Sequence, residues 1–487
     1  MRRLLACVAA TLVASTSVAV ARAVFADTEP LAAKEWYLEQ DKAWSFWPTQ
    51  PSLTPIKVAV IDSGIDGSHP EFTGRVVAAK SFVGGSPYTD EEGHGTFVAG
   101  EIAASPFNGI GIAGLAFNAQ LMVAKVVAAD GSVPLQAETA AIRWAADNGA
   151  RVINLSLGGV RDPLDHSLDT YSPLEQAAVD YAFAKGAVVV AAVGNGPQSP
   201  STPWPYADYP AALPHVIGVA AVRQDGSVPA YSNRDANYVD LAAPGDNIFS
   251  TIPQALVPAG STCPDGPYSD CGPVEFRDAI GTSFAAPQVS AAAALVLGQD
   301  PSLRPEQVAW LLERSADDDT AASGCTECPP GRDAYTGWGS LDIQAALTDL
   351  TTGTPLPPPD AYEPNDDAGP WSHAIPPLPR TITATLDYWD DQVDVYRLQL
   401  RKGQRLFARL TPEQVAATRL TLWAPGTQHV EGISVDLSKR LAQSTRAGSQ
   451  ERLAYTATVS GTYYVEAKLV APARDPVSYR LALARRS

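Results

Sequence analysis

The chain of 487 residues has few basic side chains, few cysteines and few long apolar segments. Its 35 lysines and arginines are outnumbered by 53 aspartates and glutamates, which gives a formal net charge of −18. Because no basic excess is available to neutralise phosphates, we expect no nucleic-acid partner. Beyond the N-terminal residues, no segment is long and apolar enough to span a bilayer, so we expect no stable membrane insertion.

The N-terminal residues have the composition of a secretory signal peptide. Met1-Arg2-Arg3 is positively charged, Leu4–Ala21 is apolar or small, and small residues before Ala23 and Ala26 provide cleavage sites. The alternative is a membrane anchor, for which this run is short. We therefore expect residues 1–26 to be a signal peptide and the protein to be secreted and extracellular.

Only five cysteines occur, and Cys7 belongs to the expected signal peptide. The other four are Cys263, Cys271, Cys325 and Cys328. An even number in an exported chain favours disulfides, and we expect the local pairs Cys263–Cys271 and Cys325–Cys328, although four cysteines allow three connectivities. A metal half-site or a redox motif at Cys325–Cys328 is the alternative, but no second CxxC completes a zinc set.

Three motifs far apart in the chain each hold one residue type that nucleophilic acyl transfer requires. Asp62 lies in AVIDSGIDGSHPEF, His94 in GHGTFVAG and Ser283 in GTSFAAPQ. Each residue taken singly is more often a strand-end or helix-start cap, but unrelated turns do not account for all three. We expect one catalytic centre in which Ser283 is the nucleophile, His94 the general base and acid, and Asp62 the group that orients His94.

Apolar segments alternate with helix-like segments over most of the first 300 residues. KVAVID, AQLMVAKVVA, ARVINLSL and AVVVAAVGN are strand-like, while HGTFVAGEIAAS and LQAETAAIRWAADNGA are helix-like. This alternation predicts an α/β fold, a parallel sheet with helices on both faces. Asp62 and Asn195 fall at strand ends, and His94 and Ser283 at helix starts, where such sheets bind ligands. We expect the Asn195 side chain and the Ser283 N–H to form an oxyanion hole.

Seven blocks in this order resemble the subtilisin-like serine peptidases: VAVIDSGID, GHGTFVAG, INLSLGG, VVAAVGN, YPAALPHVIGVAAV, DLAAPG and GTSFAAP. The resemblance covers residues 36–350 and implies the subtilisin-like fold, endopeptidase activity on proteins or peptides, and chemistry that needs no cofactor. It also implies that Ser156, Leu157 and Gly158 pair with extended substrate backbone. Gln288 stands where the family has histidine, but this position lies outside the triad.

Two further expectations concern calcium and maturation. The segment Asn108–Ile112 resembles a calcium loop of the family, with Glu71 at a ligand position where a shorter aspartate is usual, so a structural calcium remains open. Many relatives carry a long pro-region after the signal peptide, whereas here few residues precede the first strand. We therefore expect residues 27–50 to form an N-terminal arm or a short pro-segment.

A proline-rich linker, residues 351–362, separates the expected peptidase domain, 51–350, from a C-terminal domain, 363–487. Past the linker, TITATLDY, DVYRLQL, QRLFARLT, RLTLWA, RLAYTATV, TYYVEAKLV and VSYRLALA alternate with period two and predict an all-β sandwich. YEPNDD and DYWDDQVDVYRLQLRKGQRL resemble the bacterial pre-peptidase C-terminal domain. This implies contact with a cell surface or polymer, removal during maturation, or a stabilising appendage. Asp390, Asp391 and Asp394 fit either calcium ligands or a solvated acidic turn, and we expect the turn.

The sequence therefore predicts a secreted serine endopeptidase that forms an acyl-enzyme on Ser283. The rival function is a catalytically inactive peptide-binding protein on a peptidase scaffold. An esterase or lipase is disfavoured because no G-x-S-x-G motif surrounds Ser283.

Overall fold

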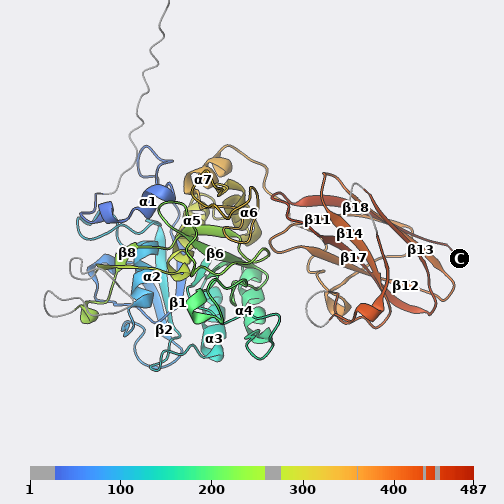
Figure 1. Cartoon of the computed structure of the whole chain (residues 1–487), viewed down its shortest axis with the longest axis horizontal. Helices are drawn as coiled ribbons and strands as arrows, with labels where there is room; N and C mark the ends of the chain where they lie inside the picture. Colours follow the sequence, from blue (N-terminus) through green and yellow to red (C-terminus); the bar gives the residue numbers. More distant parts are fainter. Residues whose placement is uncertain (1–27, 258–275, 359, 431–434, 445–449, 487) are drawn as a thin grey trace, which may run out of the picture.

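A helix-and-sheet body and a β-rich C-terminal part make up the computed structural model (Figure 1). The structure describes residues 28–257, 276–358, 360–430, 435–444 and 450–486. The expected signal peptide, together with Cys263 and Cys271, lies outside these ranges. None of the helices in the described residues has the length and apolarity needed to cross a membrane.

The body is built on a seven-stranded sheet with the order β2-β3-β1-β4-β5-β6-β7, in which neighbouring strands pair in parallel. Its strands are β1 (Ile56–Asp62), β2 (Val76–Ser81), β3 (Ala119–Lys125), β4 (Val152–Leu155), β5 (Val188–Ala192), β6 (Val216–Val222) and β7 (Leu241–Pro244). Most of these residues are buried, because helices cover both faces of the sheet.

Two apolar cores lie on opposite faces of this sheet. Val58 and Val60 of β1 belong to one core, and Ala59 and Ile61 belong to the other, as the two-residue repeat of a strand requires. The first face is covered by α2 (His94–Ala103), α5 (Ala286–Gln299), α6 (Pro305–Ser315) and α7 (Ile343–Thr351), and the second by α3 (Leu135–Asp147) and α4 (Pro173–Ala184). The predicted α/β fold is confirmed.

Short elements complete the body. The segment before β1 packs on the first core, because Tyr37 and Trp44 are buried there and the Trp44 indole N–H donates to the Leu115 carbonyl over 2.9 Å. The remaining elements are α1 (Tyr37–Gln40), the strand pair β8 (Ile248–Thr251) and β9 (Phe276–Ala279), and the 3₁₀ turns η1 (Ala32–Lys34), η2 (Pro70–Phe72), η3 (Gly196–Gln198), η4 (Gln254–Leu256) and η5 (Thr282–Phe284).

The C-terminal part is a sandwich of two sheets, as predicted. One has the order β10-β12-β17-β14-β15 and the other β11-β18-β13-β16. The first contains β10 (His373–Ala374), β12 (Val393–Leu400), β17 (Gly461–Leu469), β14 (Thr418–Trp423) and β15 (Arg440–Gln443); the second contains β11 (Arg380–Leu386), β18 (Val477–Arg486), β13 (Arg405–Pro412) and β16 (Glu451–Thr456). Turn η6 (Gly369–Trp371) precedes β10, and turn η7 (Leu437–Lys439) lies between β14 and β15. Both sheets contribute to one apolar core, which is separate from the two cores of the body.

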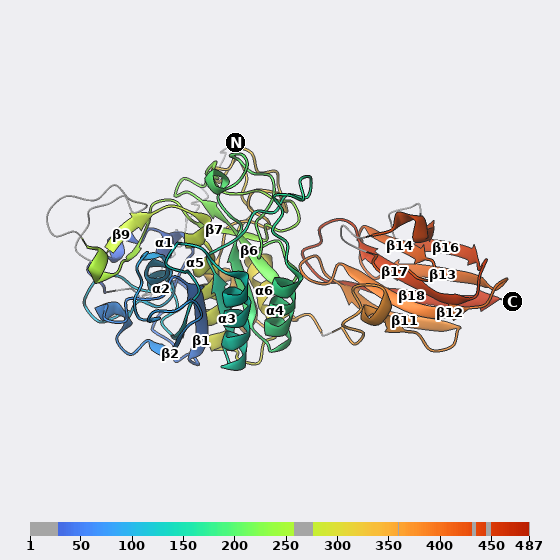
Figure 2. The ribbon, with the colours of Figure 1, turned by 90° about the horizontal axis from the view of Figure 1, so that it is seen from below.

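The sandwich lies beside the body, on the side of α4 and α6 and away from α2 (Figures 1 and 2). Polar contacts join the two parts: the Trp389 indole N–H donates to the Val216 carbonyl over 3.2 Å, and the Arg474 guanidinium donates to the Trp338 carbonyl over 2.9 Å. Val216 is the first residue of β6, so the Trp389 contact lies at the amino end of a parallel strand, opposite the carboxyl end at which Asp62 lies on β1.

Candidate active site

Asp62 and His94 form the centre of the site. Asp62 is the last residue of β1 and is 3% exposed, while His94 is the first residue of α2. The His94 Nδ1 atom lies 2.8 Å from Asp62 Oδ1 and 3.0 Å from Oδ2. Ser63 N–H also donates to Asp62 Oδ1 over 2.7 Å, so the carboxylate is held in place by its own backbone.

The charge on Asp62 controls the basicity of His94. Burial alone lowers the pKa of His94, but the Coulombic attraction and hydrogen bond of Asp62, together with Asp90 and Glu92, outweigh burial and raise this pKa above its ordinary value. The histidine is therefore a stronger base than a free imidazole and is oriented by a buried carboxylate.

Ser283 lies in the 3₁₀ turn η5, whereas the sequence predicted that it would be at the start of the long helix that follows. Helix α5 starts at Ala286, so the prediction that Ser283 starts the helix was three residues early. Gly281, with φ 150°, makes the sharp turn that precedes Ser283. Among the described residues no hydrogen bond joins the Ser283 hydroxyl to His94. Phe284, the residue after Ser283, contacts His94 with a distance of 5.4 Å between the two ring centres.

Asn195 follows β5 and is fixed by the residue before Ser283. Thr282 N–H donates to Asn195 Oδ1 over 3.0 Å, and the Thr282 hydroxyl accepts a hydrogen bond from Gly194 N–H over 3.2 Å. Because the amide oxygen is occupied, the Nδ2 group is the end of Asn195 that remains to donate. Thr282 was missed by the sequence reasoning, although it stands inside the GTS motif that located Ser283.

The segment Ser156-Leu157-Gly158 follows β4 and touches the same turn. The Ser156 hydroxyl donates to the Ser283 carbonyl over 2.7 Å. Ser156 is buried, whereas Gly158 is exposed. The segment expected to bind substrate backbone therefore lies beside Ser283.

Gln288, the departure from the family pattern, is fully buried on α5. Its amide donates to the carbonyls of Phe284 and Pro244, each over 2.8 Å, and to Glu101 Oε2 over 3.2 Å. Burial raises the pKa of Glu101 well above its ordinary value. Gln288 therefore ties α5 to α2 and β7, a packing role outside the reacting groups.

The disulfide Cys325–Cys328 is formed, with a Cα–Cα distance of 5.4 Å, which confirms one of the two expected pairs. The other pair falls on residues that the structure does not describe.

The expected calcium loop is closed by hydrogen bonds. Glu71 Oε1 accepts from Ile112 N–H over 3.0 Å, and Oε2 accepts from the Asn108 amide over 2.9 Å. Burial raises the pKa of Glu71 to about 7, because only these dipoles offset the lost hydration. The loop residues lie together as expected, but nitrogen donors already occupy the carboxylate.

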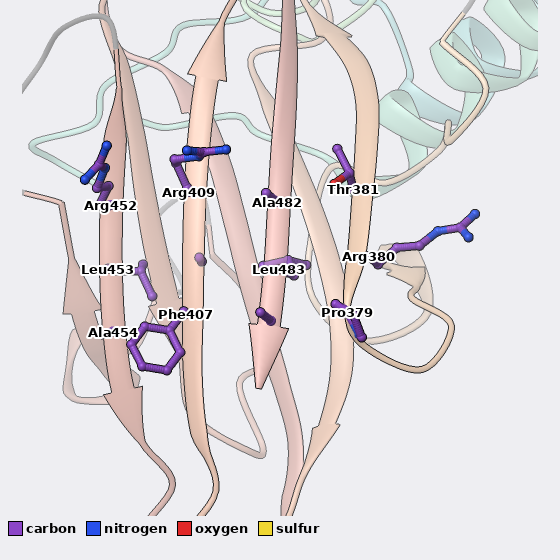
Figure 3. A pocket seen from close by; sticks show the side chains of 12 residues that line it. Pro379, Arg380, Thr381, Phe407, Arg409, Arg452, Leu453, Ala454, Ala482 and Leu483 are labelled. Carbon is purple, nitrogen blue, oxygen red and sulfur yellow. The ribbon is translucent and has the colours of Figure 1, made fainter. Parts of the chain in front are cut away.

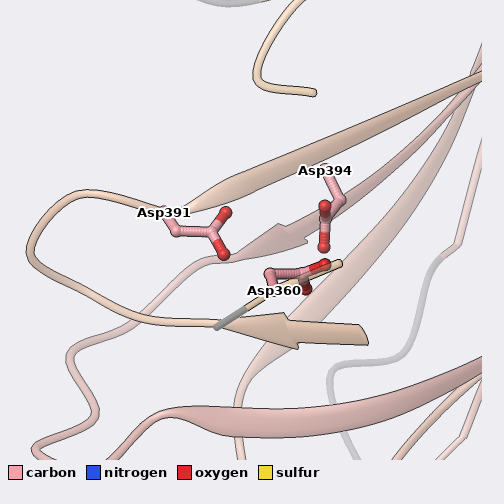
Figure 4. Close-up of side chains that lie close together, drawn as sticks. All are labelled: Asp360, Asp391 and Asp394. Atoms are coloured by element: carbon pink, nitrogen blue, oxygen red, sulfur yellow. The ribbon is translucent and has the colours of Figure 1, made fainter. Parts of the chain in front are cut away.

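A second group of oxygen ligands lies where the linker meets the sandwich (Figure 4). Carboxylate oxygens of Asp360, Asp391 and Asp394 lie within 4.8 Å of one another, and Glu363, Asp366 and Asp391 form an overlapping group. Asp394 is fully buried, so the expectation of a solvated acidic turn is wrong for this residue. Its Oδ1 atom and that of Asp391 accept no hydrogen bond from the described residues.

The outer face of the β11-β18-β13-β16 sheet carries an open hollow of about 820 Å³ (Figure 3). Its strands contain seven arginines: Arg380, Arg405, Arg409, Arg452, Arg480, Arg485 and Arg486. The only carboxylate on these strands, Glu451, is 1% exposed. Arg409 and Arg452 lie opposite each other on neighbouring strands, and the guanidinium groups of Arg405 and Arg486 lie 5.3 and 5.4 Å from the Phe407 ring centre. We call this surface the arginine face.

Comparison with known proteins identifies the family of the body. The profile of the subtilase family (peptidase S8) matches residues 54–339. Subtilisin DY of Bacillus licheniformis is 36% identical over 292 residues, which cover 60% of this chain and 90% of that protein. Subtilisin E of Bacillus subtilis (strain 168) is 38% identical over 293 residues, 60% of this chain and 65% of that protein. A solved protease of Pseudoalteromonas arctica superposes with a TM-score of 0.53 at 25% identity, covering 66% of this chain and 98% of that chain.

Proposed function

Because the chain belongs to the subtilase family of serine peptidases, we propose that it is a secreted serine endopeptidase with Asp62, His94 and Ser283 as its catalytic triad. The observation that carries the proposal is the 2.8 Å contact between His94 Nδ1 and Asp62 Oδ1, at the edge of the sheet where Ser283 and Asn195 also lie. The contact of Asp62, at the end of β1, with His94, at the start of α2, supports these roles, and so does the hydrogen bond from Thr282, the residue before Ser283, to Asn195.

In the proposed reaction, the Ser283 hydroxyl attacks the substrate carbonyl while His94 Nε2 accepts its proton. The C–O bond forms as the carbonyl π bond opens, and the oxyanion accepts hydrogen bonds from Asn195 Nδ2 and the Ser283 N–H. His94 returns the proton to the leaving amine, and water then hydrolyses the acyl-enzyme by the same steps. Asp62 stabilises the imidazolium throughout, so the chemistry needs no cofactor.

Substrate backbone is proposed to bind beside Ser156-Leu157-Gly158. This segment contacts Ser283 through the Ser156 hydroxyl and leaves Gly158 exposed. A backbone edge recognises extended main chain and tolerates many side chains, which suits protein or peptide substrates.

The test is labelling of the full chain by a fluorophosphonate, compared with the Ser283→Ala variant. We expect wild type to be labelled once and to cleave a general protein substrate, and the variant to do neither while keeping its melting temperature. A wild-type chain that binds peptides without labelling would instead support the rival peptide-binding function.

Export and maturation remain part of the proposal. Secretion rests on the composition of residues 1–26, and the buried Tyr37 and Trp44 favour a permanent arm over a removable pro-segment at 27–50. N-terminal sequencing of the secreted protein tests both: a start near Thr28 supports them, and a start after Trp47 contradicts the arm.

For the sandwich, we propose contact with an anionic polymer through the arginine face. The supporting observation is that five arginines of this sheet, Arg405, Arg409, Arg452, Arg480 and Arg486, alternate with buried residues and therefore stand on its outer face, in a chain with net charge −18. Guanidinium groups pair with carboxylate and sulfate groups in a fixed fork geometry. A single half-buried aromatic side chain, Phe407, lines this hollow, whereas stacking of successive bases needs several, so nucleic acid is disfavoured.

A structural calcium is proposed at the Asp360–Asp394 group and not at the Glu71 loop. Calcium prefers several carboxylate and carbonyl oxygens, and two oxygens of the acidic group, Asp391 Oδ1 and Asp394 Oδ1, accept no hydrogen bond from the described residues. Glu71, in contrast, already accepts two N–H groups.

A further inference from the structure

Asp208 lies where two backbone segments of the active site meet. Its N–H donates to the Val193 carbonyl over 2.9 Å, and the next residue, Tyr209, exchanges hydrogen bonds of 2.8 and 2.9 Å with Gly159. One segment continues to Asn195 and the other contains Ser156-Leu157-Gly158. Asp208 therefore closes the space between the proposed oxyanion donor and the proposed backbone-binding segment.

The Asp208 side chain lies between two glycines of these segments. A Cβ atom placed on Gly194 would lie 2.1 Å from Asp208 Oδ2, and one placed on Gly158 would lie 3.4 Å from Asp208 Cβ. Gly194 immediately precedes Asn195. The carboxylate thus takes the place that side chains at either glycine would fill, close to where the attacked carbonyl is held.

The carboxylate has no cationic partner among the described residues. Asp208 is 5% exposed, and its Oδ1 atom accepts no hydrogen bond there. Arg161 donates its backbone N–H to this carboxylate. Its guanidinium is paired with Asp235 over 2.8 Å and lies 4.8 Å from the Tyr238 ring centre. Burial accordingly raises the pKa of Asp208 to about 7.

A second acceptor lies at the same place. Asn233 is fully buried, its amide donates to the Val193 carbonyl over 3.1 Å, and its Oδ1 atom accepts no hydrogen bond from the described residues. The Asn233 amide nitrogen also lies 2.6 Å from the position of a Gly194 Cβ. Asp208 and Asn233, both beside Gly194, therefore each carry a buried oxygen without a donor among the described residues, and such oxygens are complementary to a group rich in N–H donors and positive charge.

We propose that Asp208 forms the base of the pocket for the substrate residue whose carbonyl is attacked, and that it selects lysine or arginine there. A carboxylate buried without a partner is costly, and an ammonium or guanidinium group placed against it supplies both charge and donors. If the attacked carbonyl is held at Asn195 and the substrate backbone lies along Ser156-Leu157-Gly158, the side chain between them points to the place where these two segments meet, which is where Asp208 lies. This specificity rests on the proposed function, because it needs Ser283 and Asn195 in their assigned roles.

The test compares peptide substrates that differ only at the attacked residue, which is lysine, arginine, leucine or phenylalanine. For the full chain we expect kcat/KM to be at least about tenfold higher for lysine and arginine than for leucine. In Asp208→Asn, kcat/KM for the two basic substrates is expected to fall by about 10²-fold, with that for leucine unchanged or higher. Asp225→Asn, which removes the same charge from an exposed turn, is expected to change neither.

Fluorophosphonate labelling of each variant separates the two proposals. If wild type and Asp208→Asn are labelled equally but wild type shows no preference for basic substrates, the specificity is overturned and the peptidase assignment stands. The same holds if the ratio of kcat/KM for basic substrates to that for leucine is unchanged in Asp208→Asn. A loss of labelling in Asp208→Asn assigns Asp208 a structural role and overturns the proposal as well. Absence of labelling and cleavage in wild type rejects both proposals.

Discussion

The Thr282 N–H donates to Asn195 Oδ1 over 3.0 Å, which joins residues 87 positions apart and fixes the orientation of the Asn195 amide. The side chain of Asn195, the proposed oxyanion donor, is therefore oriented by the turn that carries Ser283. Nucleophile and oxyanion donor are therefore positioned by the same backbone.

We expect Thr282→Val to reduce kcat by roughly tenfold with little change in KM, because the oxyanion donor acts mainly on the transition state. The substitution keeps the shape and the backbone N–H, but it removes the hydroxyl that donates to Asn195 Oδ1 over 3.3 Å and accepts from Gly194 N–H over 3.2 Å, at a cost of about 1–3 kcal/mol of stability. Steady-state kinetics and thermal melting measure both effects. Thr251→Val is the matched control, since Thr251 is an equally buried threonine whose hydroxyl bonds to the Thr96 carbonyl. Equal loss of kcat in both variants would contradict the positioning role.

The pH dependence of activity is expected to follow His94. The base form is active, so kcat/KM falls as pH drops through the pKa of His94, which Asp62 and its neighbours hold above the ordinary value. Asp62→Asn removes the main attraction for the imidazolium, and the acid limb of the profile should move to lower pH as the rate falls. NMR titration of the His94 ring checks the direction; an unchanged pKa in Asp62→Asn would show that Asp62 does not tune the base.

Asp208 should make the protein less stable at neutral pH than at acid pH, opposite to an ordinary ion-paired carboxylate. Its folded pKa of about 7 exceeds the ordinary unfolded value, so the penalty is absent below about pH 4 and complete above about pH 7. Asp208→Asn is therefore expected to stabilise the chain at pH 8 by up to about 4 kcal/mol and to leave it unchanged at pH 4. Denaturant unfolding at the two pH values measures this, and equal effects at both would contradict a buried, unpaired charge.

The triad motifs and the sheet could be predicted from the sequence because both are local patterns. Asp62 ends a continuous apolar strand, and the helix that begins at His94 follows a glycine with φ 85°. Strand β2 was not predicted. None of its residues is fully buried, because it lies at the edge of the sheet and pairs with β3 alone, so its sequence lacks the continuous apolar pattern of the other strands.

Asp208 and the arginine face could not be predicted, because each depends on segments that meet only in the fold. In the sequence Asp208 has no distinguishing pattern around it, and only the fold brings Gly158 and Gly194 to either side of its side chain. The arginines are spread over more than 100 residues, and strand register alone places Arg409 opposite Arg452. The same holds for Asp360 and Asp394, which the linker and β12 bring together.

Removal of calcium is expected to destabilise the sandwich. Burial and mutual repulsion raise the pKa of Asp391 and Asp394 well above ordinary values and that of Glu363 to about 9, so a divalent cation would stabilise their charged forms. Excess chelator should lower the melting temperature of wild type, and calcium should restore it. Asp391→Asn should melt independently of calcium, while Glu71→Gln keeps the wild-type response. A calcium response that Glu71→Gln abolishes would assign the ion to the other loop.

The arginine face is expected to retain the protein on anionic polysaccharides. Dextran sulfate and polygalacturonate should bind the full chain at low ionic strength, neutral dextran should not, and binding should weaken with added salt because the contacts are exposed. Replacing Arg409 and Arg452 together by glutamine should weaken binding by roughly tenfold, since two charge-assisted hydrogen-bonding groups are lost from neighbouring strands.

The matched control is the pair Arg419→Gln and Lys468→Gln, which also lie opposite each other but on the other sheet of the sandwich. This variant has the same net charge as the arginine-face variant, so a general electrostatic attraction would weaken equally in both. Binding that falls only when Arg409 and Arg452 are replaced places the polymer on the arginine face. Phe407→Leu makes the test sharper: it removes no charge but takes away the ring beneath Arg405 and Arg486, and it should weaken binding if pre-positioned guanidinium groups make the contact.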